Sequence, residues 1–235
     1  MPLEPRNAAP APIALKVLYL DASIVAISKP SGLLVHRDER HPDAPAVLQI
    51  VRDQLGKFLF PVHRLDRATS GILVYAFSRP LAAQLQASLS AATAQKEYLA
   101  LARWSGSRPQ VGERWVSTEP LKDDKDIARA AHSEFWVVET FRRSALLGCR
   151  IATGRYHQIR RHLSVSGRHV IGDVSYGKAR RNALYRARYG LDRLFLHAAR
   201  LSLLHPVSGE QLELIDPLAE ELADVVTRLR ADGAG

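Results

Sequence analysis

The sequence predicts an α+β fold built on a mixed, largely antiparallel central sheet with flanking helices. Strand-like and helix-like segments follow one another without regular alternation, which argues against a doubly wound parallel sheet. No internal repeat or linker-like segment divides residues 13–235, so we expect a single domain there. Residues 1–12 hold four prolines and no hydrophobic pattern, which predicts a disordered N-terminal tail.

The expected strands are short apolar runs bounded by turn residues. They lie at residues 16–20, 24–28, 71–77, 96–102, 135–141, 145–152, 194–204 and 211–215. The turn Asp21–Ser23 separates the first two, and Arg142–Ser144 joins the fifth and sixth into a hairpin. Residues 105–133 mix turn residues with charge, and we expect them to be surface loops.

The expected helices carry apolar residues at intervals of three and four. They lie at residues 47–55, 80–89, 156–163 and 218–229. Pro80 stands near the start of the second helix. Asp216 followed by Pro217 predicts an N-cap and first helical position for the last one.

The charge and the single cysteine restrict the function classes. A net charge of +9, carried by 26 Arg and 7 Lys against 24 acids, suggests a polyanionic partner, although GC-rich coding also produces Arg- and Ala-rich chains. Cys149 alone can form neither an intramolecular disulfide nor a Cys-rich zinc site. Neither a membrane span of roughly 20 apolar residues nor a secretory signal is evident, so we expect a soluble cytoplasmic protein.

Asp66 lies in a turn just before the expected strand 71–77, with cations on both sides. Guanidinium groups nearby hold a carboxylate ionised and oriented, as a nucleophile or general base requires at neutral pH. The same residues also fit an ordinary surface ion pair, which is common and weak. Residue types alone leave both interpretations open.

A second cluster, TGRYHQIRRHL, combines a glycine turn with a basic helix. A turn of this kind leaves backbone N–H groups free to bind an anion. Arg155 would lie near the helix start with Arg160 just over one turn beyond, while His157 and Arg161 share a face. These histidines and His63 could suggest zinc, but the missing Cys ligands and the repelling arginines argue against a metal site. A solvated basic helix is the alternative.

The segment 178–193 is the third basic feature, with Asp192 as its one acid. Its cations are Lys178, Arg180, Arg181, Arg186, Arg188 and Arg193. Tyr185 and Tyr189 interleave with them, and aromatic rings among cations suit RNA because bases stack while phosphates pair with the charges. A solvated charged loop or helix is the alternative.

Six sequence blocks occur in order along the chain. They are KPSGLLVH (29–36), HRLDRATSG (63–71), KEY (96–98), TGRYHQIRRHL (153–163), GDVSYG (172–177) and LFLHAARLSLLHPVSGE (194–210). Together they resemble the RluA-type pseudouridine synthases over about residues 15–215. The resemblance implies the pseudouridine synthase fold, a catalytic cleft, and an isomerase that converts a uridine in RNA to pseudouridine without a cofactor or a metal.

The resemblance also implies roles for individual residues. Asp66 matches the essential aspartate of the family, and Arg160 matches the arginine that pairs with it. Tyr98 matches the tyrosine that lies against the target base and is thought to act as a base in the later proton transfer. Arg64 matches the arginine that fills the gap left by the flipped nucleotide. Tyr156 departs from the pattern, since many relatives carry Thr or Lys there.

The expected RNA contacts combine this resemblance with the basic clusters. The residues are His63, Arg64, Arg67, Arg155, His157, Arg161, Lys178, Arg180, Arg181, Arg186 and Arg188. Within this family the chain resembles the subgroup that modifies a uridine in the acceptor–T-stem region of certain tRNAs. The resemblance rests on VHRDER, RRHL, the insertion 178–193 and the start without an S4 domain. We therefore expect tRNA as the partner of a monomer that needs no obligate protein partner.

Two alternatives remain from the sequence. The first is a synthase of the same family that acts on ribosomal RNA, or on both kinds of RNA. The second is a catalytically silent RNA-binding or chaperone protein of the same fold, against which the joint presence of Asp66, Tyr98 and Arg160 argues.

Overall fold

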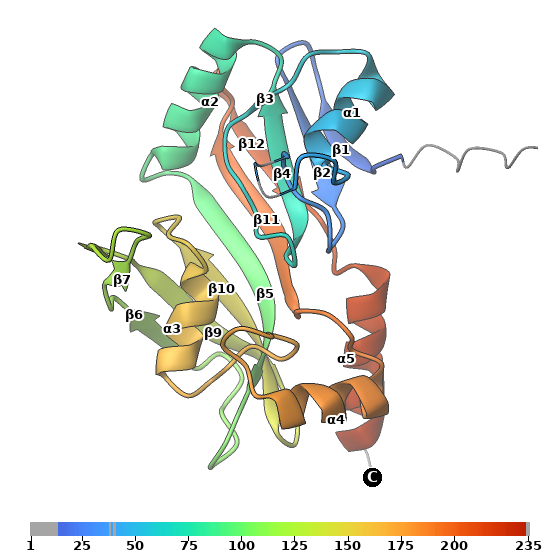
Figure 1. Ribbon diagram of the computed structural model, residues 1–235. Helices are drawn as coiled ribbons and strands as arrows, with labels where there is room; N and C mark the ends of the chain where they lie inside the picture. The colour runs from blue at the N-terminus through green and yellow to red at the C-terminus, as the bar shows by residue number, and fades with distance from the viewer. Residues whose placement is uncertain (1–13, 38, 40, 234–235) are drawn as a thin grey trace, which may run out of the picture.

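The computed structural model describes residues 14–233 except 38 and 40, so the predicted tail at 1–12 lies outside the described residues. One ten-stranded sheet runs through the molecule (Figure 1). Its strands are, in spatial order, β1 (Val17–Leu20), β2 (Ile24–Lys29), β4 (Ser70–Ala76), β11 (Leu196–Leu204), β5 (Gln95–Arg103), β10 (Ser144–Ile151), β9 (Ser133–Thr140) and β6 (Arg114–Ser117), with β12 (Gln211–Ile215) paired to β11 and β3 (Phe60–Pro61) paired to β4.

The pairing confirms the predicted fold class. Among the described strands of this sheet, β11 and β4 pair in parallel, and the other neighbours pair antiparallel. The parallel pair brings Gly71 against Ala198, where a Cβ on Gly71 would lie 2.3 Å from the Ala198 carbonyl oxygen. Gly71 also has a φ of +113°, so this junction beside Asp66 requires glycine.

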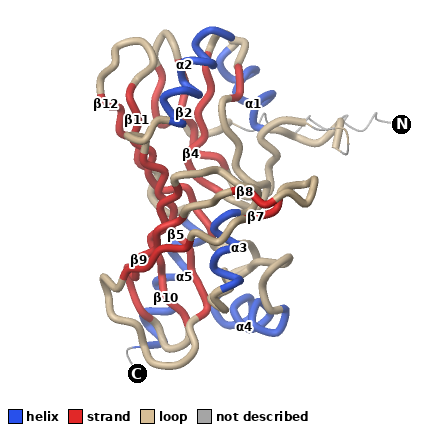
Figure 2. The backbone as a smooth tube through the Cα atoms, turned by 90° about the vertical axis from the view of Figure 1, so that its left-hand side faces the viewer, coloured by secondary structure: helices blue, strands red, loops and turns tan. Residues whose placement is uncertain are grey.

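Five helices cover the described sheet. They are α1 (Val47–Leu55), α2 (Arg79–Ser90), α3 (Gln158–Val165), α4 (Ala179–Tyr189) and α5 (Glu220–Gly233). The apolar residues of α1 and α3 pack on one face, and Tyr98 contacts both of these core clusters. The apolar residues of α2 and α5 pack on the other face. Figure 2 shows the sheet from its edge, with α3 standing off one side.

The eight predicted strands are confirmed to within two residues at each end, but residues 105–133 are not all loop. They contain β6 and a small hairpin of β7 (Leu121–Lys122) and β8 (Ala128–Arg129). Trp115 explains the added strand, because its ring stacks on Phe135 of β9 with the ring centroids 5.3 Å apart. A short, mostly exposed segment can thus form an edge strand when an aromatic residue finds a partner ring on the neighbouring strand.

Two helix starts differ from the prediction. His157 adopts a left-handed φ of +53°, so α3 begins at Gln158 rather than at 156. Asp216 does not cap α5, which begins at Glu220. Its buried carboxylate instead accepts a 2.6 Å hydrogen bond from the Ser28 hydroxyl and lies 3.7 Å from His197 Nε2. Asp216 therefore ties the C-terminal segment to the sheet.

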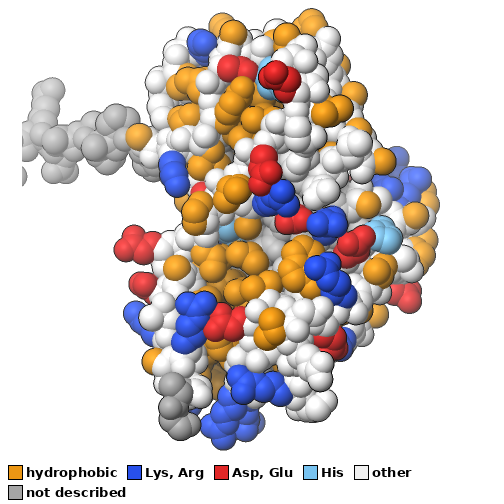
Figure 3. All heavy atoms as spheres, turned by 180° about the vertical axis from the view of Figure 1, so that it is seen from behind, with side chains coloured by type: hydrophobic (Ala, Val, Ile, Leu, Met, Phe, Trp, Pro, Cys, Tyr) orange, Lys and Arg blue, Asp and Glu red, His pale blue; other side chains and the backbone are white. Residues whose placement is uncertain are grey.

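The surface away from α3 carries both apolar and charged side chains. Seen from behind, hydrophobic side chains are exposed over the middle of the molecule, and Lys and Arg side chains gather towards its lower end (Figure 3). In the part of the chain that the structure describes, no helix combines the length and apolarity that crossing a membrane requires.

Candidate active site

A cleft of about 440 Å³ lies on the sheet face that carries α1 and α3. Its walls come from the loop before β4, from β5, and from the N-terminal end of α3. The three predicted catalytic residues, Asp66, Tyr98 and Arg160, all line it. Four of the predicted RNA-binding residues line it as well, namely His63, Arg64, Arg155 and His157.

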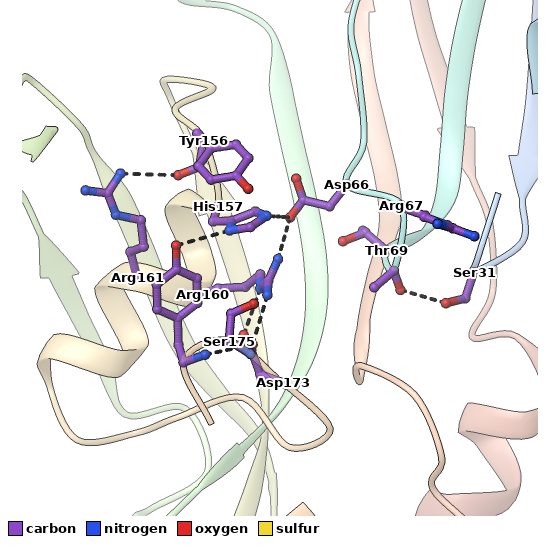
Figure 4. A network of polar contacts seen from close by, with 12 residues as sticks. Ser31, Asp66, Arg67, Thr69, Tyr156, His157, Arg160, Arg161, Asp173 and Ser175 are labelled. Carbon is purple, nitrogen blue, oxygen red and sulfur yellow. Dashed lines mark hydrogen bonds and ion pairs between the residues drawn. The ribbon is translucent and has the colours of Figure 1, made fainter. Parts of the chain in front are cut away.

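Arg160 lies between two carboxylates (Figure 4). Its Nη1 lies 3.3 Å from Asp66 Oδ2, while its Nε and Nη2 donate to the two oxygens of Asp173 at 2.7 and 2.9 Å. The Asp66 side chain is 23% exposed and the Asp173 side chain is fully buried. The forked guanidinium is thus held by Asp173 from behind and offers its remaining nitrogen to Asp66.

The charges of this network support one another. Burial would lower the pKa of Arg160, but the hydrogen bonds and charges of Asp173 and Asp66 raise it instead. Burial would raise the pKa of Asp173, yet the hydrogen bonds from Arg160 and from the N–H groups of Tyr176 and Ser175 lower it. Asp173 and Arg160 therefore form a charged pair that stays intact across neutral pH.

The sequence indicates no role for Asp173. It belongs to the GDVSYG block, but that block alone does not indicate what the carboxylate binds. Only the fold reveals the need for this carboxylate, because Arg160 is 5% exposed and a single partly exposed carboxylate does not satisfy its donors.

His157 forms the other side of the Asp66 contact. Its Nε2 lies 3.6 Å from Asp66 Oδ2, and its Nδ1 lies 3.1 Å from the Tyr176 hydroxyl. Tyr156 stacks on the imidazole with the ring centroids 3.7 Å apart. Burial, followed by the charges of Arg160 and Arg161, lowers the pKa of His157 despite the opposing effect of Asp66. A neutral imidazole therefore lines the cleft at neutral pH.

Tyr98 presents its ring to the cleft from β5. Burial, and then the nearby charge of Asp66, raise the pKa of its hydroxyl above the ordinary value of 10.0. The hydroxyl is therefore protonated at neutral pH. In this state Tyr98 offers an aromatic surface and a proton, and it can accept a proton only after its own has been transferred.

Lys29 holds the loop that carries Asp66. Its side chain is fully buried, and its Nζ donates to the carbonyls of Pro30, Arg67 and Thr69 at 3.0, 3.1 and 2.8 Å. Burial, with the charge of Arg193, lowers the pKa of Lys29 to about 7. The Ser31 hydroxyl adds a 2.8 Å bond to the Ala68 carbonyl. The KPSG sequence thus positions the catalytic loop.

Replacing Lys29 by methionine is expected to lower the free energy of unfolding by about 2–4 kcal/mol, because three backbone carbonyls lose a buried donor. The turnover number should fall too, since the Asp66 loop is no longer held. Urea unfolding and single-turnover kinetics measure the two effects. Lys125→Met, at an exposed loop position, is the control and should change neither. Equal stability of the two variants would contradict the anchoring role.

His63 lines the cleft, but its ring also has a structural contact, because Nε2 accepts a 3.0 Å hydrogen bond from the Val74 N–H. Burial, with the charge of Lys96, lowers its pKa from 6.5 to about 4. Between these pH values the unfolded chain binds a proton that the folded chain excludes, so stability falls as the pH drops from about 6.5 to about 4.

We expect this loss to amount to about 3 kcal/mol from His63 over that pH range. Urea unfolding at several pH values between 7 and 4 measures it. In His63→Gln the dependence of stability on pH should flatten, whatever the absolute stability of the variant. Identical pH slopes for the two proteins would show that His63 is not the group responsible.

The remaining predicted RNA-binding cations divide into two groups. Arg67, Arg155 and Arg161 donate to backbone carbonyls of neighbouring loops, and Arg64 is exposed at the cleft. The cations of α4 and its N-cap do not line the cleft at all. They are Lys178, Arg180, Arg181, Arg186 and Arg188.

One prediction about α4 was wrong. Tyr185 and Tyr189 do not interleave with the cations as stacking surfaces for bases, because they are 3% and 8% exposed. Both pack in the core cluster that includes the apolar face of α5. At helical spacing the two rings share the inner face, which leaves the cations outside.

The described residues contain no group of three His, Cys, Asp or Glu side chains that could hold a metal ion.

The sequence model of the family described as RNA pseudouridylate synthase matches residues 23–165, which include Asp66, Tyr98 and Arg160. The chain belongs to the RNA pseudouridylate synthase family. It is an isomerase, and its resemblance to the RluA type is confirmed.

Relatives named for tRNA and relatives named for ribosomal RNA match this pseudouridine synthase at similar sequence identity. The tRNA pseudouridine synthase C of Vibrio parahaemolyticus is 32% identical over 244 residues, which cover 94% of this chain and 98% of that protein. The ribosomal large subunit pseudouridine synthase C of Vibrio vulnificus is 36% identical over 219 residues, which cover 91% and 69%. The solved structure of human RNA pseudouridylate synthase domain containing 4 has a TM-score of 0.73 at 25% identity, covering 92% and 93% of the two chains.

Proposed function

We propose that this pseudouridine synthase acts on tRNA and isomerises uridine 65 in the acceptor–T-stem region. The relative named for tRNA supports this substrate, because the match spans nearly all of both proteins. The observation that carries the catalytic proposal is the contact of Asp66 with Arg160 in the cleft. We propose further that the enzyme acts in the cytoplasm as a monomer, without an obligate protein partner.

The reaction breaks the N1–C1′ bond of the target nucleotide and joins C5 of the same uracil to C1′. Neither oxidation nor reduction occurs, so we propose no cofactor. The target must leave its stack, which costs a few kcal/mol. Arg64 is exposed and lines the cleft, which supports the proposal that it fills the vacated space and meets phosphates. The cleft then holds the detached uracil away from water.

Asp66 and Tyr98 act on the nucleotide in this proposal. The Asp66 carboxylate faces the cleft while Arg160 balances its charge as the base displaces water. The ring of Tyr98 lies where it can support the uracil. Its protonated hydroxyl can take up the C5 proton only after passing its own proton on, so Tyr98 works as a relay rather than as a ready base.

The test is to incubate the purified protein with total tRNA and, separately, with ribosomal RNA lacking modification, and to map new pseudouridines. We expect one new pseudouridine in the acceptor–T-stem region of tRNA. New pseudouridines in ribosomal RNA alone would replace the proposed substrate with the second candidate, which the 36% identical relative favours. Binding of both RNAs without any product would contradict an active enzyme and favour the catalytically silent alternative.

A further inference from the structure

A second hollow, of about 700 Å³, lies at the N-terminal end of α4. Five of its six lining residues are cations, and none is an acid. The six are Arg103, Arg143, Lys178, Arg180, Arg181 and Leu184. Arg103 and Arg143 lie outside all the basic clusters that the sequence indicated, so this group of charges exists only in the folded chain.

Backbone hydrogen bonds bring three distant segments together there. The Trp104 N–H donates to the Arg143 carbonyl at 3.1 Å, and the Arg103 N–H donates to the His169 carbonyl at 2.9 Å. Arg103 at the end of β5 also pairs in register with Ser144 at the start of β10. The positions of the two arginines are thus determined by the sheet and not by a free loop.

The cations of this hollow lack protein partners. Among the described residues no side chain forms a hydrogen bond or ion pair with the side chains of any of the five. Other arginines nearby are paired, for example Arg188 with Asp232 and Arg193 with Glu221. The Arg181 Nη1 atom is even buried without a hydrogen-bond partner. Such an arrangement is costly by itself and becomes favourable when an anion enters.

The local chemistry suits phosphate. Guanidinium groups bind phosphate oxygens in pairs through their fork of N–H donors. The eleven-residue helix α4 begins here, with Lys178 as an N-cap that makes no side-chain capping bond. The helix N-terminus adds backbone N–H donors and a favourable dipole for negative charge.

The loop before α4 connects this hollow to the active site. Asp173 binds Arg160, the Tyr176 hydroxyl contacts His157, and Lys178 lines the hollow only two residues further on. Two residues of extended chain span at most about 7 Å. Because this one short loop contacts the active-site residues and also lines the hollow, we expect a structured RNA that places a nucleotide in the cleft to reach the hollow with its backbone.

We propose that this hollow binds backbone phosphates of the same RNA whose target uridine occupies the cleft, an inference that rests on the proposed function. Arg103 and Arg143 then bind RNA together with Lys178, Arg180 and Arg181.

The experiment measures RNA affinity by fluorescence anisotropy at several salt concentrations, together with kcat and KM for pseudouridine formation. In Arg103→Gln/Arg143→Gln we expect Kd and KM to rise about tenfold with kcat unchanged, and the slope of log K against log salt to lose about 2. The control Arg79→Gln/Lys125→Gln removes two exposed charges elsewhere and should change Kd by less than about twofold. Lys178→Gln/Arg180→Gln provides a second lining pair, both exposed, in case the first variant folds poorly.

Equal losses in the lining and control variants would overturn the proposal, because the effect would then come from overall charge. Unchanged RNA binding in both lining variants would overturn it as well. Lining variants that lose affinity for inorganic phosphate or pyrophosphate but keep their affinity for RNA would overturn it too. The hollow would then be a site for small anions. Failure of the proposed function has a different signature, namely RNA that binds to the hollow but gains no pseudouridine.

Discussion

Replacing Asp66 by asparagine is expected to lower the rate of pseudouridine formation by at least about 1,000-fold while changing RNA affinity by less than about twofold. The amide keeps the size of the side chain but loses the negative charge that faces the cleft and pairs with Arg160. We expect binding to be spared, because in the proposed complex the surface cations, and not Asp66, contact the phosphates. Release of tritium from [5-³H]uridine-labelled tRNA measures turnover, and fluorescence anisotropy measures affinity.

Asp224→Asn is the matched control, since Asp224 is an exposed carboxylate on α5. It should retain the wild-type rate. Turnover of Asp66→Asn within tenfold of wild type would remove Asp66 from the chemistry. Loss of RNA binding in this variant would show instead that Asp66 organises the RNA surface.

Replacing Asp173 by asparagine should have the second largest effect, although Asp173 does not line the cleft. The change leaves Arg160 buried with a single partly exposed partner, so we expect the free energy of unfolding to fall by about 3 kcal/mol. Because Arg160 is then free to turn away from Asp66, kcat should fall about 10- to 100-fold with KM nearly unchanged. Urea unfolding and steady-state kinetics measure these quantities.

A fall in kcat with an unchanged KM distinguishes a role of Asp173 in positioning Arg160 from a role in stability alone. A variant that is only less stable loses active enzyme but keeps the kcat of each folded molecule. Tyr176→Phe is a useful comparison, because it removes the contact with His157 and leaves the Arg160 network in place. If folded Asp173→Asn turns over at the wild-type rate, Asp173 does not position Arg160.

The central strands and helices could be predicted because their burial follows local apolar patterns. β4 is buried along its whole length, as its continuous apolar run indicates. The errors arose where a partner distant in sequence determines the outcome. Asp216 reads locally as a helix cap, but it binds Ser28, 188 residues away. The sequence pattern around Tyr185 and Tyr189 is typical of exposed aromatic residues, but in the fold both rings pack against α5.

The same distinction applies to the site. Motifs predicted Asp66, Tyr98 and Arg160 as catalytic residues, and the fold brings all three to one cleft. The residues around them were not predicted, because their roles depend on contacts between segments that are distant in the sequence. Lys29 donates to carbonyls up to 40 residues away, and Arg103 and Arg143 line one hollow only because β5 pairs with β10. No spacing rule in the sequence reveals such contacts.

The three hydrogen bonds of Lys29 also affect how substrates are chosen. They hold the Asp66 loop in place in the free protein, so little of the protein has to become ordered when RNA arrives. The deformation needed for the reaction then falls on the nucleic acid, whose nucleotide must unstack and rotate outwards. Among uridines with equal access to the cleft, those in weakly stacked or mispaired surroundings react first. A rigid enzyme of this kind selects its RNA by how easily the target nucleotide leaves its stack, as well as by charge.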